Sequence, residues 1–233
     1  MTATPPPDPF LPILRALAAH QVSCVVVGGL ATVLYGHARL THDVDVAIDM
    51  ADENVARLLA ACAALGLEPA VPEAPTALAD PVWRASWTAD RHMVDFPWTQ
   101  PSGPLRLDVL LDPSVPFAEL HRDAVQMPVL GVPIAVASLT HLIALKEAAG
   151  RPQDVDDVRQ LRALDALHVQ REGQPPAATE HTDAGCLAVR EFPLTPVAPG
   201  HALSVSEAAQ LAQTARLSPE ERFGVLYSLW SFW

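Results

Sequence analysis

Hydrophobic residues along the chain follow two periods, one typical of strands and one typical of helices. The clearest strand covers residues 105–111, where apolar side chains stand at every second position with Arg106 and Asp108 between them. Further short strands are predicted over residues 23–27, 44–48, 82–88, 92–98, 125–130 and 132–136. The pairs 82–88 with 92–98 and 125–130 with 132–136 should form hairpins, with turns near Asp90 and at Gly131.

Apolar residues at helical spacing predict helices between and after these strands. Gly36 and Gly66 each directly follow one of them, which is where a helix commonly ends. Ser138 is the expected cap of a helix, and Ser218 followed by Pro219 is a strong start for the last one. The predicted helices cover residues 10–20, 30–35, 53–65, 138–149, 154–168, 206–217 and 219–233. The mixture is not a regular βαβ repeat.

Proline divides the chain into parts. Many of its 23 residues cluster at the N-terminus, between Pro69 and Pro81, and from Pro175 to Pro199. Proline lacks a backbone donor and disfavours helix in the residue before it, so we expect loops and linkers there. The sequence predicts a compact domain over residues 1–170, a proline-rich linker over 171–200 and a helical tail over 201–233.

The net charge is -12, from 15 Lys and Arg against 27 Asp and Glu. This balance lacks the basic field that drives non-specific nucleic-acid binding, although a local patch could still bind one RNA. The three cysteines show neither a disulfide framework nor zinc spacing. Residues 1–9 do not have the pattern of a signal peptide, and no apolar run reaches membrane-spanning length. We therefore expect a cytoplasmic protein without a membrane segment.

Three aspartates carry the candidate chemistry. Asp43 and Asp45 stand two residues apart, so on a strand their carboxylates point to the same face and repel unless a cation lies between them. Asp108 lies within an apolar strand, where an unpaired charge would be costly. Magnesium prefers carboxylate oxygens together with phosphates and water. Three carboxylates converging from two strands suit two-metal phosphoryl or nucleotidyl transfer, so we expect two Mg²⁺ ions here.

A pair of glycines supplies the second half of the predicted site. Gly28 and Gly29 follow an apolar strand and precede a helix, so the backbone can approach a phosphate at the N-terminal end of that helix. Arg39 and Thr41 lie on the approach to the aspartate pair. They are candidate contacts to the same triphosphate.

These residues form a recognisable order, which is Gly-Gly, a later Gly, and then Arg-x-Thr-x-Asp-x-Asp. With the strand over residues 105–111 and the segment 138–157, this order resembles the polymerase-beta-like nucleotidyltransferase superfamily. It is most similar to the bacterial solitary or toxin-type (abortive-infection-like) branch, over about residues 10–168. The resemblance implies an α+β fold with a small, mixed twisted sheet flanked by helices, and the predicted tail would add a helical C-terminal extension. It also implies magnesium dependence and transfer of a nucleoside monophosphate (NMP) from a nucleoside triphosphate (NTP).

The resemblance also implies a role for each candidate residue. Asp43 and Asp45 would bind both metal ions, and Asp108 would bind the ion that activates the acceptor hydroxyl. The glycine pair would cradle the triphosphate, and Lys146 would meet its charge from the helical side. Many members of the superfamily have Gly-Ser where this chain has Gly28-Gly29, which removes one hydroxyl contact to phosphate.

Each candidate has a plainer structural interpretation as well. The aspartate pair could cap a turn, and Asp108 could face solvent, in which case Asp95 competes for the place of third ligand. Arg39 could make a structural salt bridge. The remaining alternatives are surface cations at Lys146 and Arg151, exposed loop positions at His37 and His42, and helix stabilisation by Asp154, Asp156 and Asp157.

The acceptor and the base of the NTP stay open at this point. An RNA 3′ end, a protein hydroxyl and a small molecule such as an antibiotic all fit the same metal site. A function of another class is a catalytically silent nucleotide-fold protein that binds a partner, as in a toxin–antitoxin-like pair. It is motivated by the aromatic side of the last helix, a surface for a protein partner or for self-association. That side carries Phe223, Leu226, Tyr227, Trp230 and Trp233.

Overall fold

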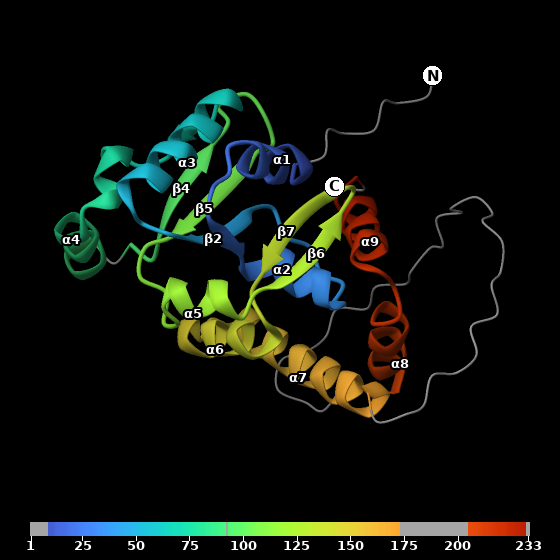
Figure 1. Cartoon of the computed structure of the whole chain (residues 1–233). Helices are drawn as coiled ribbons and strands as arrows, with labels where there is room; N and C mark the ends of the chain where they lie inside the picture. Colours follow the sequence, from blue (N-terminus) through green and yellow to red (C-terminus); the bar gives the residue numbers. More distant parts are fainter. Residues whose placement is uncertain (1–8, 92, 173–204, 232–233) are drawn as a thin grey trace, which may run out of the picture.

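The computed structural model describes residues 9–91, 93–172 and 205–231, and the statements below concern these residues. A seven-stranded sheet has the order β3-β4-β5-β2-β1-β7-β6 (Figure 1). β1 pairs with β7 and β2 with β5 in parallel, and the other neighbours are antiparallel. The strands are β1 (Cys24–Val26), β2 (Val44–Ile48), β3 (Glu68–Pro69), β4 (Asp95–Thr99), β5 (Arg106–Leu110), β6 (Val125–Val129) and β7 (Val132–Val136).

Helices flank this mixed sheet, which confirms the predicted fold class. In the view of Figure 1, α1 and α3 lie above the sheet and α5, α6 and α7 lie below it. In the described part of the chain, no helix combines the length and the apolar character that crossing a membrane requires. The helices are α1 (Leu11–Ala19), α2 (Gly28–Tyr35), α3 (Asp52–Ala64), the 3₁₀ helix η1 (Pro75–Ala79), α4 (Pro81–Arg91), α5 (Phe117–Arg122), α6 (Leu139–Ala149), α7 (Pro152–Glu172), α8 (Val205–Thr214) and α9 (Pro219–Ser231).

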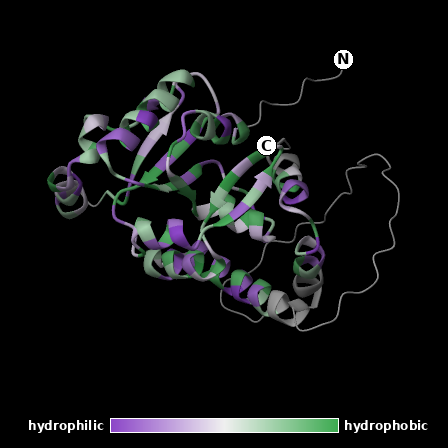
Figure 2. Ribbon diagram, in the orientation of Figure 1, coloured by the Kyte–Doolittle hydropathy of each residue, from purple (hydrophilic) through white to green (hydrophobic). Residues whose placement is uncertain are grey.

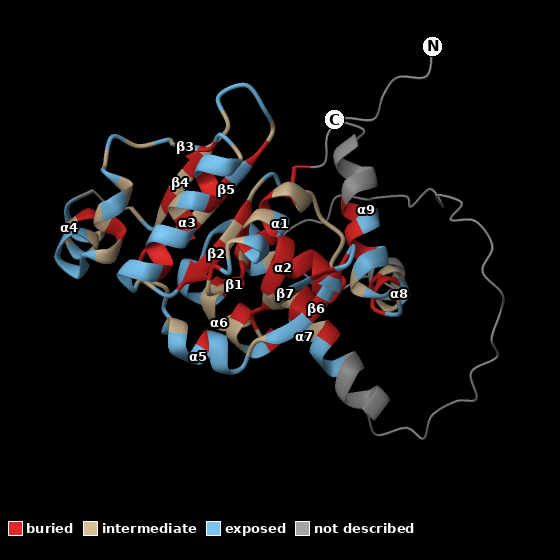
Figure 3. Cartoon of the chain, turned by 45° about the horizontal axis from the view of Figure 1, so that its top comes forward, coloured by how far each residue is buried: buried red, intermediate tan, exposed pale blue. Residues whose placement is uncertain are grey.

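The core is centred on the middle strands and on α2. The strands are mostly apolar, whereas the outer helices alternate polar and apolar positions (Figure 2). Every residue of α2 after Gly28 is buried, and the helix is apolar on all sides (Figure 3). A helix of that kind must be enclosed. Accordingly, α2 contacts β2 on one side and α6, α7 and α9 on others.

Local capping chemistry explains where several helices begin and end. The Ser138 hydroxyl accepts a hydrogen bond from the His141 N–H, as predicted for the cap of α6. Ser218 and Glu221 bond to each other's backbone N–H at 3.2 and 2.7 Å, which is a capping box at the start of α9. α2 ends at Gly36, which has a φ of 118°. These predicted boundaries are confirmed.

The predicted hairpin over residues 82–98 is wrong in its first half. The segment that we expected to be a strand is α4, and β4 pairs with β3 and β5 instead. Pro81 is well suited to the first turn of a helix, and the Asp80 carboxylate accepts a hydrogen bond from the Val82 N–H at 2.8 Å. The helix directs Trp87 into the core against Phe96, with ring centroids 5.6 Å apart. The predicted loop over residues 69–81 also contains η1.

The C-terminal helices pack on the core. Leu211, Phe223 and Leu226 are buried, and the Phe223 ring meets the Phe10 ring edge-on at 6.1 Å. The expectation that Phe223 and Leu226 belong to an exposed side of the last helix is therefore wrong. The side chains of Tyr227 and Trp230, the residue Trp233 and nearly all of the predicted linker over 171–200 lie outside the described residues.

A buried arginine joins α9 to the end of α2. The Arg222 guanidinium donates hydrogen bonds to the carbonyl oxygens of Leu34, Thr214 and Ala215, at 2.5, 3.1 and 2.8 Å. The Thr214 hydroxyl donates to the Gly36 carbonyl at 2.5 Å. Carbonyls in the last turn of a helix lack partners within the helix. The tail therefore supplies hydrogen-bond donors to the C-terminal end of α2.

Replacing Arg222 by Met keeps an apolar stem and removes the donors. Because three buried main-chain oxygens would lose a partner, we expect the free energy of unfolding to fall by about 2–4 kcal/mol in urea denaturation. Arg216→Met, at an exposed position between α8 and α9, should change it by less than about 0.5 kcal/mol. Equal effects of the two substitutions would refute the proposed role of Arg222.

Candidate metal centre and glycine turn

Three aspartates meet at the centre of the sheet. Asp45 on β2 and Asp108 on β5 are direct register partners on adjacent parallel strands, so their side chains lie on the same face. Asp43 stands two residues before Asp45, just ahead of β2. One carboxylate oxygen from each of the three lies within 4.8 Å of the other two. The structure thus brings together the three acids that the sequence singled out.

The apolar positions of β2 and β5 determine this convergence. Val44 and Val46 alternate with Asp45, and Leu107 and Val109 flank Asp108; none of these four apolar side chains is more than 1% exposed. In a strand, successive residues point to opposite faces, so burying the apolar set turns the aspartates to the other face. A slip of one residue would bury the acids, and the apolar set therefore sets the register.

Burial, together with the close approach of the carboxylates, raises the pKa of two of them. Burial, and then the charge of Asp43, raises the pKa of Asp45 to about 6. Burial, and then the charges of Asp95 and Asp45, raises the pKa of Asp108 to about 7. Both shifts mean that the ionised form of each carboxylate is unfavourable here. A bound cation would offset the burial and the mutual repulsion. A set of hard carboxylate oxygens held this close together fits Mg²⁺.

Asp95, the competitor for the third position, flanks the group without joining it. It lies on β4 opposite Leu110, two residues before Pro97, the register partner of Asp108. Burial is the main cause of its raised pKa, followed by opposing effects of Arg151 and Asp43. The compact group of oxygens contains Asp108 and not Asp95. Within the described residues, Asp108 is therefore the third carboxylate.

The glycine pair lies against these carboxylates. Gly28 has a φ of 61°, and a Cβ there would stand 1.8 Å from Asp45 Oδ2. A Cβ on Gly29 would stand 2.3 Å from the Thr41 hydroxyl. The Gly29 N–H donates a hydrogen bond to Asp45 Oδ2 at 3.2 Å. The N-terminal end of α2 therefore directly adjoins the three acids, at a turn that side chains larger than hydrogen would obstruct.

Thr41 orients the first aspartate. Its buried hydroxyl donates a hydrogen bond to Asp43 Oδ1 at 2.9 Å. The sequence predicts a contact between Thr41 and the triphosphate, and in the structure its hydroxyl has this partner within the protein.

Arg39 and Lys146 both contact an acid that the sequence analysis did not place in the site. Arg39 Nη1 lies 2.7 Å from Asp157 Oδ2, and Lys146 Nζ lies 2.5 Å from the same oxygen. Lys146 also reaches Asp154 at 3.3 Å and is only 5% exposed, so it is not a surface cation. Sequence spacing alone could not identify this cluster, because its members come from a loop and two different helices.

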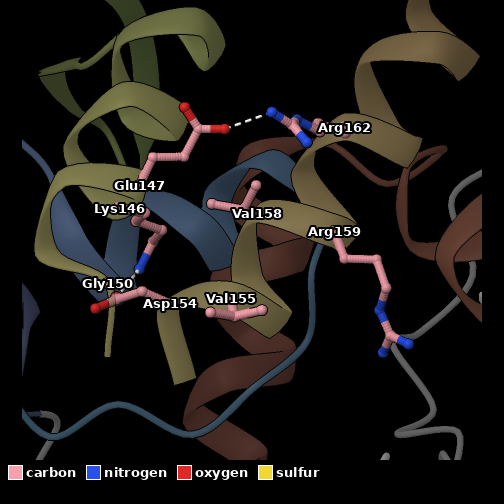
Figure 4. A pocket seen from close by; sticks show the side chains of 8 residues that line it. All are labelled: Lys146, Glu147, Gly150, Asp154, Val155, Val158, Arg159 and Arg162. Carbon is pink, nitrogen blue, oxygen red and sulfur yellow. Dashed lines mark hydrogen bonds and ion pairs between the residues drawn. The ribbon is translucent and has the colours of Figure 1, made fainter. Parts of the chain in front are cut away.

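A cavity of about 500 Å³ lies between α6 and α7 (Figure 4). Its walls include Lys146 and Asp154 from the charged cluster, together with Arg159 and Arg162. None of the three metal-centre aspartates lines it. The candidate metal centre is therefore not part of this cavity.

Solved structures of known proteins include chains similar to this one. No protein-family model matches the chain, and no curated protein matches it. The crystal structure of ANT(2")-Ia in complex with adenylyl-2"-tobramycin is similar at a TM-score of 0.42 and 17% sequence identity. The match covers 70% of this chain and 95% of that chain. A likeness at this level does not extend to function.

Removing the charge of Asp108 should stabilise the metal-free protein. A carboxyl group with a raised pKa in the folded state destabilises that state once pH exceeds its unfolded value near 4, and the full cost is reached above about pH 7. In EDTA at pH 8, we expect Asp108→Asn to raise the Tm by about 2–4 °C, and the gain should shrink by pH 5. The exposed Asp112→Asn should give no gain. An unchanged or lower Tm for Asp108→Asn at pH 8 would refute this account of the site.

The glycine turn can be tested with a matched pair of substitutions. Gly28→Ala and Gly66→Ala both put a side chain at a φ near 60°, but only Gly28 has a neighbour within 4 Å of the new methyl group. We expect both to lose about 1 kcal/mol of stability or more. Gly28→Ala should also weaken Mn²⁺ binding at least about tenfold, since the methyl group displaces Asp45. Equal Mn²⁺ affinity of the two variants, measured by electron paramagnetic resonance, would contradict the expectation.

Proposed function

We propose that this chain is a magnesium-dependent nucleotidyltransferase that moves an NMP from an NTP to an acceptor hydroxyl. The observation that carries the proposal is the group of three carboxylates within 4.8 Å, set directly against the turn at Gly28 and Gly29. In two-metal sites, carboxylates hold the ions from one side and substrate phosphates from the other. The resemblance of residues 28–45 to the polymerase-beta-like order supports the same reaction.

Each acidic residue would have a distinct part. Asp43 and Asp45 would hold both ions, and Asp108 would hold the one beside the acceptor. Bound divalent ions would supply neutralisation of the charge that develops on the phosphate. The acceptor oxygen would form a bond to the α-phosphorus while its proton passes to the Asp108 carboxylate. The bond from the α-phosphorus to the bridging oxygen would break, and pyrophosphate would leave with that electron pair.

The rest of the site would position these groups. Thr41 holds Asp43, and the Gly29 N–H holds Asp45, so both carboxylates have a defined orientation before substrate binds. Such preorganisation reduces the reorganisation needed during the reaction. The free N–H groups and the dipole at the start of α2 would favour the triphosphate beside the ions.

The net charge of -12 bears on the acceptor. It disfavours an acceptor held through many non-specific phosphate contacts. RNA, protein and small-molecule acceptors can be distinguished by experiment, because the fraction of a cell extract that becomes labelled identifies the class of acceptor.

Transfer can be tested with each of the four α-³²P-labelled NTPs, Mg²⁺ and a fractionated cell extract. We expect label to move from at least one NTP to one fraction, and to stay on the NTP in EDTA. Asp45→Asn should reduce transfer at least about a hundredfold because a ligand to both ions is lost. Asp112→Asn, an exposed aspartate just after β5, should transfer like the wild type. Full activity in Asp45→Asn, with both variants folded by circular dichroism, would overturn the proposal.

A further inference from the structure

Asp157 on α7 stands at the middle of a buried cluster of charges beside the metal centre. It is 1% exposed, and its carboxylate meets Arg39 Nη1 at 2.7 Å, Lys146 Nζ at 2.5 Å and His37 Nε2 at 3.4 Å. Arg39 and His37 come from the loop between α2 and β2, whereas Lys146 comes from α6. The Asp157 side chain therefore connects α7 to α6 and to the loop that leads to Asp43.

Arg39 and Lys146 of this cluster lie next to the proposed substrate site. Arg39 Nη2 is 2.7 Å from the place that a Cβ on Gly29 would take, so the guanidinium borders the glycine turn. Its Nε is buried without a hydrogen-bond partner within the described residues. Lys146 is close enough to Asp45 that its charge lowers the pKa of that carboxyl, against the larger effects of burial and Asp43. Both cations thus contact Asp157 and also lie near the glycine turn or the metal-binding carboxylates.

Arg39 and Lys146 do not pair with the carboxylates of the metal centre, although those carboxylates lie close together and repel one another. Three carboxylates converge within 4.8 Å of one another at the metal centre, yet Arg39 and Lys146 bond to Asp157. Burial raises the pKa of Asp157, but the hydrogen bond with His37 and the charges of Arg39 and Lys146 outweigh it and lower the pKa, so the carboxylate competes for these cations. Buried ion pairs contribute little net stability compared with apolar side chains of similar volume. The position in which the cluster holds Arg39 and Lys146 therefore explains its presence better than a contribution to stability does.

We infer that Asp157 is a positioning residue that holds Arg39 and Lys146 beside the glycine turn and off the metal-binding carboxylates. The inference rests on the proposed function, because the group to be bound at the turn is the triphosphate. Arg39 would keep Nη1 on Asp157 and present its other edge to phosphate oxygens, which is a charge-assisted contact. Lys146, held by Asp157 and Asp154, would add its charge without occupying the place of a metal ion.

The test uses two probes, Mn²⁺ alone and magnesium tripolyphosphate, with the full chain in isothermal titration calorimetry. In Asp157→Asn, we expect the Kd for tripolyphosphate to rise at least about tenfold, since both cations lose their common anchor. The Kd for Mn²⁺ should rise at least about threefold, because the released ammonium moves onto the carboxylates. Asp165→Asn removes the same charge from an exposed position on the same helix, and should leave both values within about twofold.

A second substitution separates positioning from general loosening. Adding Lys146→Met to Asp157→Asn removes the ammonium, so Mn²⁺ affinity should return to within about twofold of wild type while tripolyphosphate binding stays weak. If Asp157→Asn does not fold, Arg39→Gln provides the test: tripolyphosphate binding should weaken at least about tenfold and Mn²⁺ binding should not change. Wild-type affinity for tripolyphosphate in Asp157→Asn, or in Arg39→Gln where Asp157→Asn does not fold, would overturn the inference. So would a loss of Mn²⁺ binding in Asp157→Asn that Lys146→Met does not restore.

These measurements also distinguish this inference from the proposed function. A wild-type protein that binds neither probe would overturn both. A wild-type protein that binds both probes, with Asp157→Asn unaffected, would overturn the positioning role alone. The expected shifts in binding without any transfer of labelled NMP would support the role of Asp157 and overturn nucleotidyl transfer.

Discussion

The mutual repulsion of three carboxylates is the constraint on which the rest of the site depends. The parallel pairing of β2 with β5 sets Asp45 directly beside Asp108. The buried apolar residues on either side of each aspartate fix this register, because a shift by one residue would expose them. The surrounding structure accommodates this repulsion through short contacts from the glycine turn and Thr41. The fold therefore tolerates three carboxylates close together. Because they repel one another, they favour binding of divalent cations.

The parts of the fold that depend on local pattern could be predicted from the sequence. The alternation around Asp108 predicted β5, and the two-residue spacing of Asp43 and Asp45 predicted a shared face. Helix boundaries at Gly36 and Ser138 followed from local capping preferences. These features were accessible because each depends on residues within one or two turns of one another.

Other features were missed because they depend on contacts across the chain. Residues 82–88 fit a strand pattern over a short window, and the pairing of β4 with β5 and β3 left no partner for such a strand. The contact of Asp157 with Arg39 joins residues 118 positions apart, and that of Arg222 with Leu34 joins residues 188 positions apart. Periodicity carries no information on such pairs, so neither the charged cluster nor the packing of α8 and α9 could be inferred from it.

The short helix α2 has different neighbours at its two ends. Its first residues border the carboxylates, and the carbonyls at its other end accept hydrogen bonds from Arg222 and Thr214. Eight residues span about 12 Å, so α2 acts as a single rigid strut between the tail and the glycine turn. A fragment ending at residue 170 would keep all three aspartates and lose the support at the far end of this strut, which makes it a poor substitute for the whole chain.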